Sequence, residues 1–153
     1  MLTKAYCTKT QLLEKFLDDE YFKQTPPKST GREYFNETWI ANNLPLFQTI
    51  KDEDIQRTLL ELTVQTIAND VKNNDTKLLI VCGGGVKNSF LMQRLRELCD
   101  IEVKSSDSLG ISSDFMEAMA FAWFAKMRVH NQEVDLKSVT GAKKNSILGG
   151  IYG

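Results

Sequence analysis

Gly83, Gly84 and Gly85 are the residues of this sequence best suited to contact a ligand through bare backbone. Without a Cβ, such a turn can adopt positive φ and lets a flat or charged ligand approach the main chain. Lys87 and Asn88 follow, and the free N–H groups of a helix start favour an anion or a polar ligand edge. The run fits neither a dinucleotide fingerprint nor a Walker A loop. The alternative is that the glycines serve only a tight turn and close helix–strand packing.

Glu117 is a second candidate, because it is a lone carboxylate near the start of the otherwise apolar stretch 115–125. A charge in such surroundings is costly unless it is paired. Asp114 and Glu117 have the spacing of an N-cap and N3 residue, so helix capping is one explanation. The other is a carboxylate that points into a cleft, where it could bind a sugar hydroxyl or tune a reacting centre.

Residues 28–32 leave a similar choice between binding and capping. Their basic and hydroxyl side chains could contact a phosphate or a carboxylate. Thr30 and Glu33 also have capping-box spacing, which predicts a helix that includes Trp39. His130 is more typical of a surface or C-cap position than of a ligand, and the sequence contains no CxxC pair, so we expect no metal site.

The elements around the glycines predict a strand, a turn and a helix. Leu78–Val81 is a run of four bulky apolar residues, typical of a strand buried on both faces. Residues 90–98 have helical spacing, and 101–104 alternate as a short strand does. In open α/β sheets, ligands bind beyond the carboxyl ends of the strands, which is where the glycine turn would lie.

Three further segments have helical patterns. Residues 10–22 predict a short amphipathic helix, and a long helix from residue 52 or 54 to about 72 has a broad apolar face, as expected for a helix laid across a sheet. The stretch 115–125 is apolar nearly all round, which predicts a central helix. The polar tail 138–144 predicts a loop, followed at 147–152 by an edge strand or packed end.

The bulk composition excludes several classes of protein. From its length of 153 residues, of which 42% are apolar, we expect the chain to form a single α/β lobe over 1–153. The net charge is −1 without a basic stripe, so we expect no nucleic-acid partner. No apolar run approaches the roughly 20 residues that cross a bilayer, so we expect no membrane partner. The N-terminus lacks a signal-peptide core. Cys82 and Cys99 lie in apolar surroundings, which predicts buried thiols and a cytoplasmic protein.

Four motifs together resemble one family. In chain order they are PPKSTGREYFN, LLIVCGGGVKNSFLMQRL, SSDSLGISSDFMEAMAFAWFA and SVTGAKKNSILGGIYG. Their order and gaps are similar to those of the C-terminal half of anhydro-N-acetylmuramic acid kinases, over about 26–153. The resemblance implies an α/β fold, the C-terminal lobe of an actin/hexokinase-like (ribonuclease-H-like) sugar kinase, with a small sheet flanked by helices.

The resemblance also implies a reaction and a site. Members of the family use ATP and Mg²⁺ to phosphorylate 1,6-anhydro-N-acetylmuramic acid at O6, and open its anhydro ring with water, in cytoplasmic recycling of cell-wall sugars. By this resemblance Gly83, Gly84 and Gly85 would lie against the adenosine side of ATP or ADP, with Asn88 nearby. Glu117 would face the sugar.

The chain departs from the family in one respect that bears on activity. Whole members carry a phosphate loop and a catalytic aspartate that precede the region matched here, and neither has a counterpart. Phosphoryl transfer depends on positioning and charge stabilisation at the γ-phosphate. We therefore expect no catalytic residue and no kinase activity in this chain alone, and an N-terminal lobe that is missing or supplied by a partner chain. The alternative is a non-catalytic nucleotide-binding or interaction module. Apolar surface left exposed could also produce a homodimer.

Overall fold

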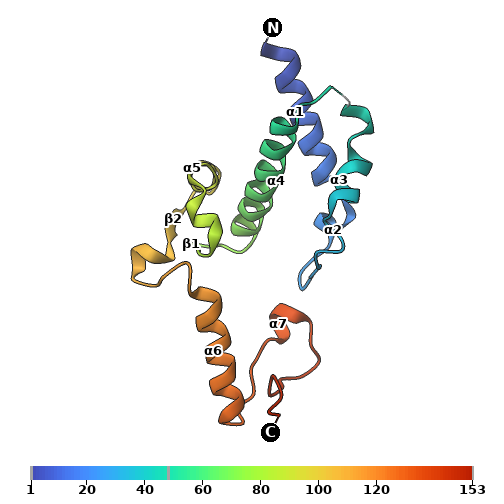
Figure 1. Ribbon diagram of the computed structural model, residues 1–153. Coiled ribbons are helices and arrows are strands. Elements are labelled where there is room, and N and C mark those ends of the chain that lie inside the picture. Colours follow the sequence, from blue (N-terminus) through green and yellow to red (C-terminus); the bar gives the residue numbers. More distant parts are fainter. Residues whose placement is uncertain (1, 48, 153) are drawn as a thin grey trace. The chain divides into compact units, whose positions relative to one another are not determined.

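The computed structural model describes residues 2–47 and 49–152, with side chains for 9–47, 49–137 and 139–152 (Figure 1). In chain order the elements are α1 (Leu2–Leu17), α2 (Glu20–Lys23), α3 (Glu37–Asn43), the 3-10 helix η1 (Pro45–Phe47), α4 (Asp52–Asn73), β1 (Leu78–Val81), η2 (Gly84–Lys87), α5 (Ser89–Leu98), β2 (Glu102–Ser105), η3 (Ser106–Leu109), α6 (Met116–Val129) and α7 (Lys137–Thr140). Two compact units divide the chain. Unit 1 comprises 1–24, 30–79 and 88–103, and unit 2 comprises 25–29, 80–87 and 104–153.

Unit 1 contains a packed apolar core. Helices α1 and α4 pack against each other, and Leu12, Phe16 and Leu62 are buried between them together with Phe47 of η1. The Phe16 ring stacks on Trp39 of α3, with ring centroids 4.8 Å apart. Burial of such side chains is the main source of stability, at roughly 1.5–3 kcal/mol for each large one.

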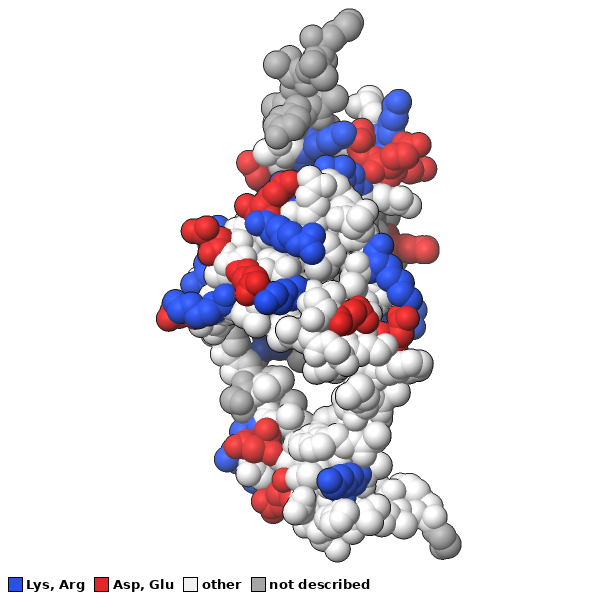
Figure 2. All heavy atoms as spheres, turned by 90° about the vertical axis from the view of Figure 1, so that its left-hand side faces the viewer, with Lys and Arg blue, Asp and Glu red and all other residues white. Residues whose placement is uncertain are grey.

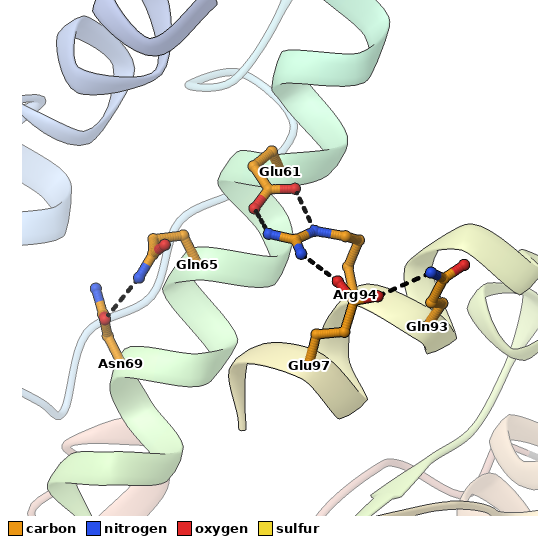
Figure 3. A network of polar contacts seen from close by, with 6 residues as sticks. All are labelled: Glu61, Gln65, Asn69, Gln93, Arg94 and Glu97. Atoms are coloured by element: carbon orange, nitrogen blue, oxygen red, sulfur yellow. Dashed lines mark hydrogen bonds and ion pairs between the residues drawn. The ribbon is translucent and has the colours of Figure 1, made fainter. Parts of the chain in front are cut away.

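Helices α4 and α5 also pack together, and an ion-pair network joins them (Figure 3). The Arg94 guanidinium donates from Nε to Glu61 Oε2 at 2.9 Å and from Nη2 to Glu61 Oε1 at 2.6 Å, and also pairs with Glu97. The hydrogen bonds to Glu61, above all, raise the pKa of Arg94. This two-point contact fixes the rotation of α5 on α4, because a planar guanidinium matches a carboxylate in one orientation.

The helix predictions for unit 1 are only partly correct. The long helix predicted from residue 52 or 54 is confirmed as α4, although it packs mainly on α1 and α5. The predicted helix 10–22 begins at Leu2 instead and stops at Leu17. The capping box at Thr30 does not form, since the helix begins at Glu37 with Asn36 as its cap, whose Oδ1 accepts from Trp39 N at 2.9 Å. Asparagine, with its short polar side chain, caps as well as threonine does.

The predicted strands are confirmed as β1 and β2, which form a small two-stranded parallel sheet connected through α5. The expected burial of β1 on both faces is wrong, because Leu78 and Ile80 are exposed and only Leu79 and Val81 are partly covered. The prediction for the cysteines is half right. Cys99 is buried, and burial raises the pKa of its thiol, whereas Cys82 is exposed.

Unit 2 is built around α6, and here the prediction of a central helix is wrong. No residue of α6 is buried. Where a polar loop was expected, Lys137–Thr140 forms α7. Residues 147–152, expected to form an edge strand or packed end, form no strand and leave Ile151 and Tyr152 exposed, and an isolated bridge pairs Val134 with Ser146 just before them. Among the described residues, none of the helices combines the length and apolar character that spanning a membrane requires.

Candidate functional site

The glycine turn follows β1 directly and leads into α5, as predicted. After Val81 and the exposed Cys82, Gly83 adopts φ +75°, which lets the chain reverse at the end of the strand. Gly84 opens η2, which ends at Lys87. The positive φ of Gly83 explains a glycine at that position, since other residues adopt this conformation at a cost of about 1 kcal/mol.

Gly84 has no such structural explanation. It is not among the described glycines with positive φ, and a Cβ placed on it meets no heavy atom within 4 Å. The space beside Gly83 is equally open. Close helix–strand packing would put neighbours within contact of the missing Cβ, so packing explains neither glycine, while the tight turn still explains Gly83. An open turn of bare backbone can accept a flat ligand.

Two contacts connect the glycine turn to the segment that precedes α6. Gly83 N donates to Ser113 O at 3.1 Å, and Lys87 Nζ pairs with Asp114 Oδ1 at 2.6 Å. Hydrogen bonding to Asp114 raises the pKa of Lys87. The glycine turn and the segment that contains Ser113 and Asp114 are therefore held together within unit 2.

The residues that hold this second segment in place carry no motif in the sequence. The backbone N–H of Ser113 donates to Asp107 Oδ1 at 2.9 Å, which lowers the pKa of Asp107. Ser106 and Ser113 are both buried, although serines in a polar loop predict exposure. No periodic pattern marks these positions. The one available signal is an aspartate before a Gly turn, which commonly accepts bonds from nearby backbone N–H groups.

Asn88 has a structural role that the sequence left open. It is the N-cap of α5, and its Oδ1 accepts from Leu91 N at 3.0 Å. This cap uses the oxygen of the side-chain amide and leaves its N–H₂ group out of the bond. Asn88 thus orients the first turn of α5, whose N–H groups follow the glycine turn directly.

Glu117 lies in the first turn of α6 and is exposed. The predicted capping pair with Asp114 does not form, because Phe115 is the N-cap and makes no side-chain cap bond, while Asp114 pairs with Lys87. Helix capping is therefore a weaker explanation for Glu117 than its spacing to Asp114 indicated. A carboxylate in a first helical turn is still favoured by the helix dipole.

The remaining candidates stay predictions or receive a structural role. His130 is the C-cap of α6, as expected for a residue that ends a helix, and its Nδ1 lies 2.8 Å from Lys126 O. Residues 28–32 acquire no assigned binding role. In the described part of the chain, no group of three or more His, Cys, Asp or Glu side chains is arranged to hold a metal ion.

A small parallel sheet with helices between and beside its strands places the chain in the α/β class. A family model described as anhydro-N-acetylmuramic acid kinase matches residues 3–153. The chain belongs to this family, which confirms the resemblance read from the four motifs.

Relatives named anhydro-N-acetylmuramic acid kinase match most of the chain. That of Sulfurimonas denitrificans is 55% identical over 150 residues, which cover 93% of this chain and 41% of the relative. Those of Sulfurovum sp. and Actinobacillus pleuropneumoniae serotype 3 are 50% and 47% identical, and each match covers 92% of this chain and 39% of the relative. The chain thus spans about two fifths of the length of these curated relatives.

Proposed function

We propose that this chain supplies the nucleotide-binding turn and part of the sugar site of an ATP-dependent cytoplasmic kinase, which converts 1,6-anhydro-N-acetylmuramic acid to N-acetylmuramic acid 6-phosphate. Its family membership supports the reaction class. Gly83, Gly84, Gly85 and Asn88 are the residues assigned to the nucleotide, and Glu117 is assigned to the sugar. The chain is proposed to act as the C-terminal lobe of an actin/hexokinase-like fold.

The observation that carries this proposal is the open space beside Gly84. The open space beside it and its ordinary backbone conformation leave its missing side chain unexplained by folding. A ligand that packs flat on the main chain explains the glycine, because any Cβ would occupy the ligand's place. The adenosine part of ATP or ADP has this shape.

Each residue of the chain has a defined task in this proposal. Gly83 and Gly84 present backbone to the nucleotide, while the Asn88 cap and the Lys87–Asp114 pair hold the turn in shape. Glu117 accepts a hydroxyl hydrogen bond from the sugar and so orients the acceptor oxygen. Mg²⁺ would neutralise charge on the transferred phosphoryl group, and we assign no Mg²⁺ ligand and no catalytic base to this chain.

The test of the nucleotide site is titration calorimetry of the chain with ADP. We expect Gly84→Val to weaken ADP binding by about tenfold or more, because the branched side chain fills the space above the turn. Gly84→Ala should have a smaller effect of the same sign. Ala142→Val, in an exposed loop, is the matched control and should leave ADP affinity unchanged. Equal ADP affinity in Gly84→Val and the parent chain would refute the placement of the nucleotide.

The catalytic part of the proposal requires the rest of a family member. We expect no turnover from the chain alone, and ATP-dependent phosphorylation of 1,6-anhydro-N-acetylmuramic acid when it is co-expressed with the part of the Sulfurimonas denitrificans relative that it does not match. In that mixture Glu117→Gln should raise the KM for the sugar without changing ADP affinity. A soluble complex of the two polypeptides that shows no turnover would contradict the enzymatic proposal.

The second candidate function is a non-catalytic module that binds nucleotide or only associates with other chains. ADP binding that Gly84→Val abolishes, together with an inactive complex, is the result that would select this candidate.

A further inference from the structure

The glycine turn is held at both ends by two consecutive residues of a distant segment. At its start Gly83 N donates to Ser113 O at 3.1 Å, and at its end Lys87 Nζ pairs with Asp114 Oδ1 at 2.6 Å. All four residues belong to unit 2. The shape of the turn therefore depends on where the backbone of Ser113 and Asp114 lies.

The segment that carries Ser113 has no regular structure to fix its backbone. Residues 111–115 lie between η3 and α6, outside every helix and strand that the structure describes. The contact that holds the buried Ser113 comes from the Asp107 carboxylate, whose Oδ1 accepts from Ser113 N at 2.9 Å. Hydrogen bonds from the Ser113 backbone N–H, and then from its hydroxyl, lower the pKa of Asp107, so the carboxylate is ionised and a strong acceptor.

The 3-10 helix η3 gives this carboxylate a defined position. At the start of η3, Ser106 is fully buried and its carbonyl accepts from Ile111 N at 3.0 Å. At its end, Gly110 adopts φ +78° and donates its N–H to Asp107 O at 3.0 Å. Asp107 thus projects from a loop closed by main-chain hydrogen bonds, and it can act as the fixed point for the irregular segment that follows.

We propose that Asp107 is the positioning residue of the nucleotide turn and that it acts through Ser113. The carboxylate fixes the Ser113 backbone, and the Ser113 carbonyl then fixes the N–H of Gly83 and the direction of the bare backbone after it. A turn that is free to rotate would present its N–H groups to the ligand in several directions, and binding depends on orientation. This inference rests on the proposed function, which assigns ADP or ATP to the turn.

The charge of Asp107 predicts the opposite effect from its position. The carboxylate lies within electrostatic reach of Lys87 at the end of the turn, so it repels an anionic nucleotide there. On the face shown in Figure 2, basic and acidic side chains are interspersed rather than gathered by sign, so the general field on that face is weak. Removal of Asp107 should therefore strengthen ADP binding if only charge matters, and weaken it if the carboxylate positions the turn.

The first test is amide hydrogen exchange measured by NMR without nucleotide. Asp107→Ala should speed exchange of the Gly83 N–H by about fivefold or more, as expected when its acceptor is no longer held. The N–H of the buried Val64 in unit 1 should keep its rate in the same sample, which separates a local change from unfolding. Asp100→Ala removes an equal charge at an exposed position and is the control that should alter neither rate.

Two conservative variants separate the position of the carboxylate from its charge. Asp107→Asn keeps an oxygen acceptor at the same distance from the backbone and loses the charge, so its Gly83 exchange rate should stay within about twofold of the parent. Asp107→Glu keeps the charge but displaces the oxygens by one methylene, and should resemble Asp107→Ala. The reverse order of these two variants, or an unchanged Gly83 rate in Asp107→Ala, would overturn the inference.

Titration calorimetry with ADP connects the position of the turn to binding. We expect Asp107→Ala to weaken ADP binding by about fivefold, and Asp107→Asn and Asp100→Ala to remain close to the parent. If Gly84→Val weakens binding and Asp107→Ala does not, this inference is wrong and the proposed function stands. If neither variant changes ADP affinity, the proposed nucleotide site fails together with it.

Discussion

The two units of this chain differ in where they place their apolar side chains. Among the residues whose side chains are described, every buried hydrophobic one except Val134 belongs to unit 1, whereas most of the exposed large ones belong to unit 2. Among the described side chains, the half-buried Arg94 and Glu61 of unit 1 pair with each other, while the buried Ser106 Oγ, Arg128 Nε and Asn145 Oδ1 of unit 2 have no hydrogen-bond partner. The comparison indicates that unit 1 supplies stability of its own, and that unit 2 carries the open turn to which the proposed function assigns the nucleotide.

The largest expected effect is loss of the unit 1 core. Phe16→Ala should lower the free energy of unfolding by about 3–5 kcal/mol, because it leaves a cavity where a fully buried ring stacks on Trp39. Phe121→Ala in unit 2 should cost less than about 1 kcal/mol, since that ring is mostly exposed. Urea unfolding followed by circular dichroism measures both values. Equal costs would show that unit 2 has a core of its own in solution.

The ion pair between α4 and α5 should have an intermediate effect on stability. Arg94→Ala leaves the half-buried Glu61 carboxylate without its two hydrogen bonds, and should cost about 1–3 kcal/mol. Arg94→Lys keeps the charge but loses the two-point geometry, so it should fall between the parent and Arg94→Ala. The same urea titration is the measurement. If Arg94→Lys matched the parent, the contact would be a simple charge attraction.

Thiol reactivity distinguishes the two units without changing their structure. In a Cys7→Ser background, iodoacetamide should modify Cys82 of unit 2 at least about tenfold faster than Cys99 of unit 1, because Cys99 is buried and burial raises the pKa of its thiol. Mass spectrometry of timed samples gives the two rates. ADP should slow the reaction of Cys82, which adjoins the glycine turn. Equal rates for the two thiols would mean that unit 1 opens readily.

The smallest expected effect is the pH dependence of unit 1. Burial acts to raise the pKa of Asp19, but hydrogen bonds from Trp39 Nε1, the Tyr21 N–H and the Tyr34 hydroxyl, each 2.8 Å long, outweigh it and lower the pKa. A lowered folded-state pKa adds stability above the unfolded-state value near 4, and this stability is lost as the pH falls through the folded-state pKa.

Asp19→Asn removes the titrating group, so the parent should lose about 1 kcal/mol more than the variant between pH 7 and pH 3. Urea unfolding monitored by tryptophan fluorescence measures this difference. Identical pH profiles for the two proteins would show that the carboxylate of Asp19 contributes nothing to folding.

Local patterns predicted local structure well. Leu78–Val81 forms a strand, three glycines make a turn, and the periodic apolar residues of 52–72 form a long helix. These outcomes depend on neighbours in sequence. Predictions about burial were less successful, because β1 and α6 have the composition of interior elements and are exposed here. Burial depends on which other elements cover a face. An apolar composition shows that an element needs to be covered, but it does not show which other element covers it.

The sequence by itself determined the family and the residues that could contact a nucleotide, because motif order and glycine spacing are properties of the chain. Only the tertiary structure decided that Gly84 has open space beside it, that Ser113 and Asp114 hold the turn from a distant segment, and that no residue of α6 is buried within its unit. Each of these depends on contacts between residues far apart in the chain, or on their absence among the described residues, and no local spacing encodes them.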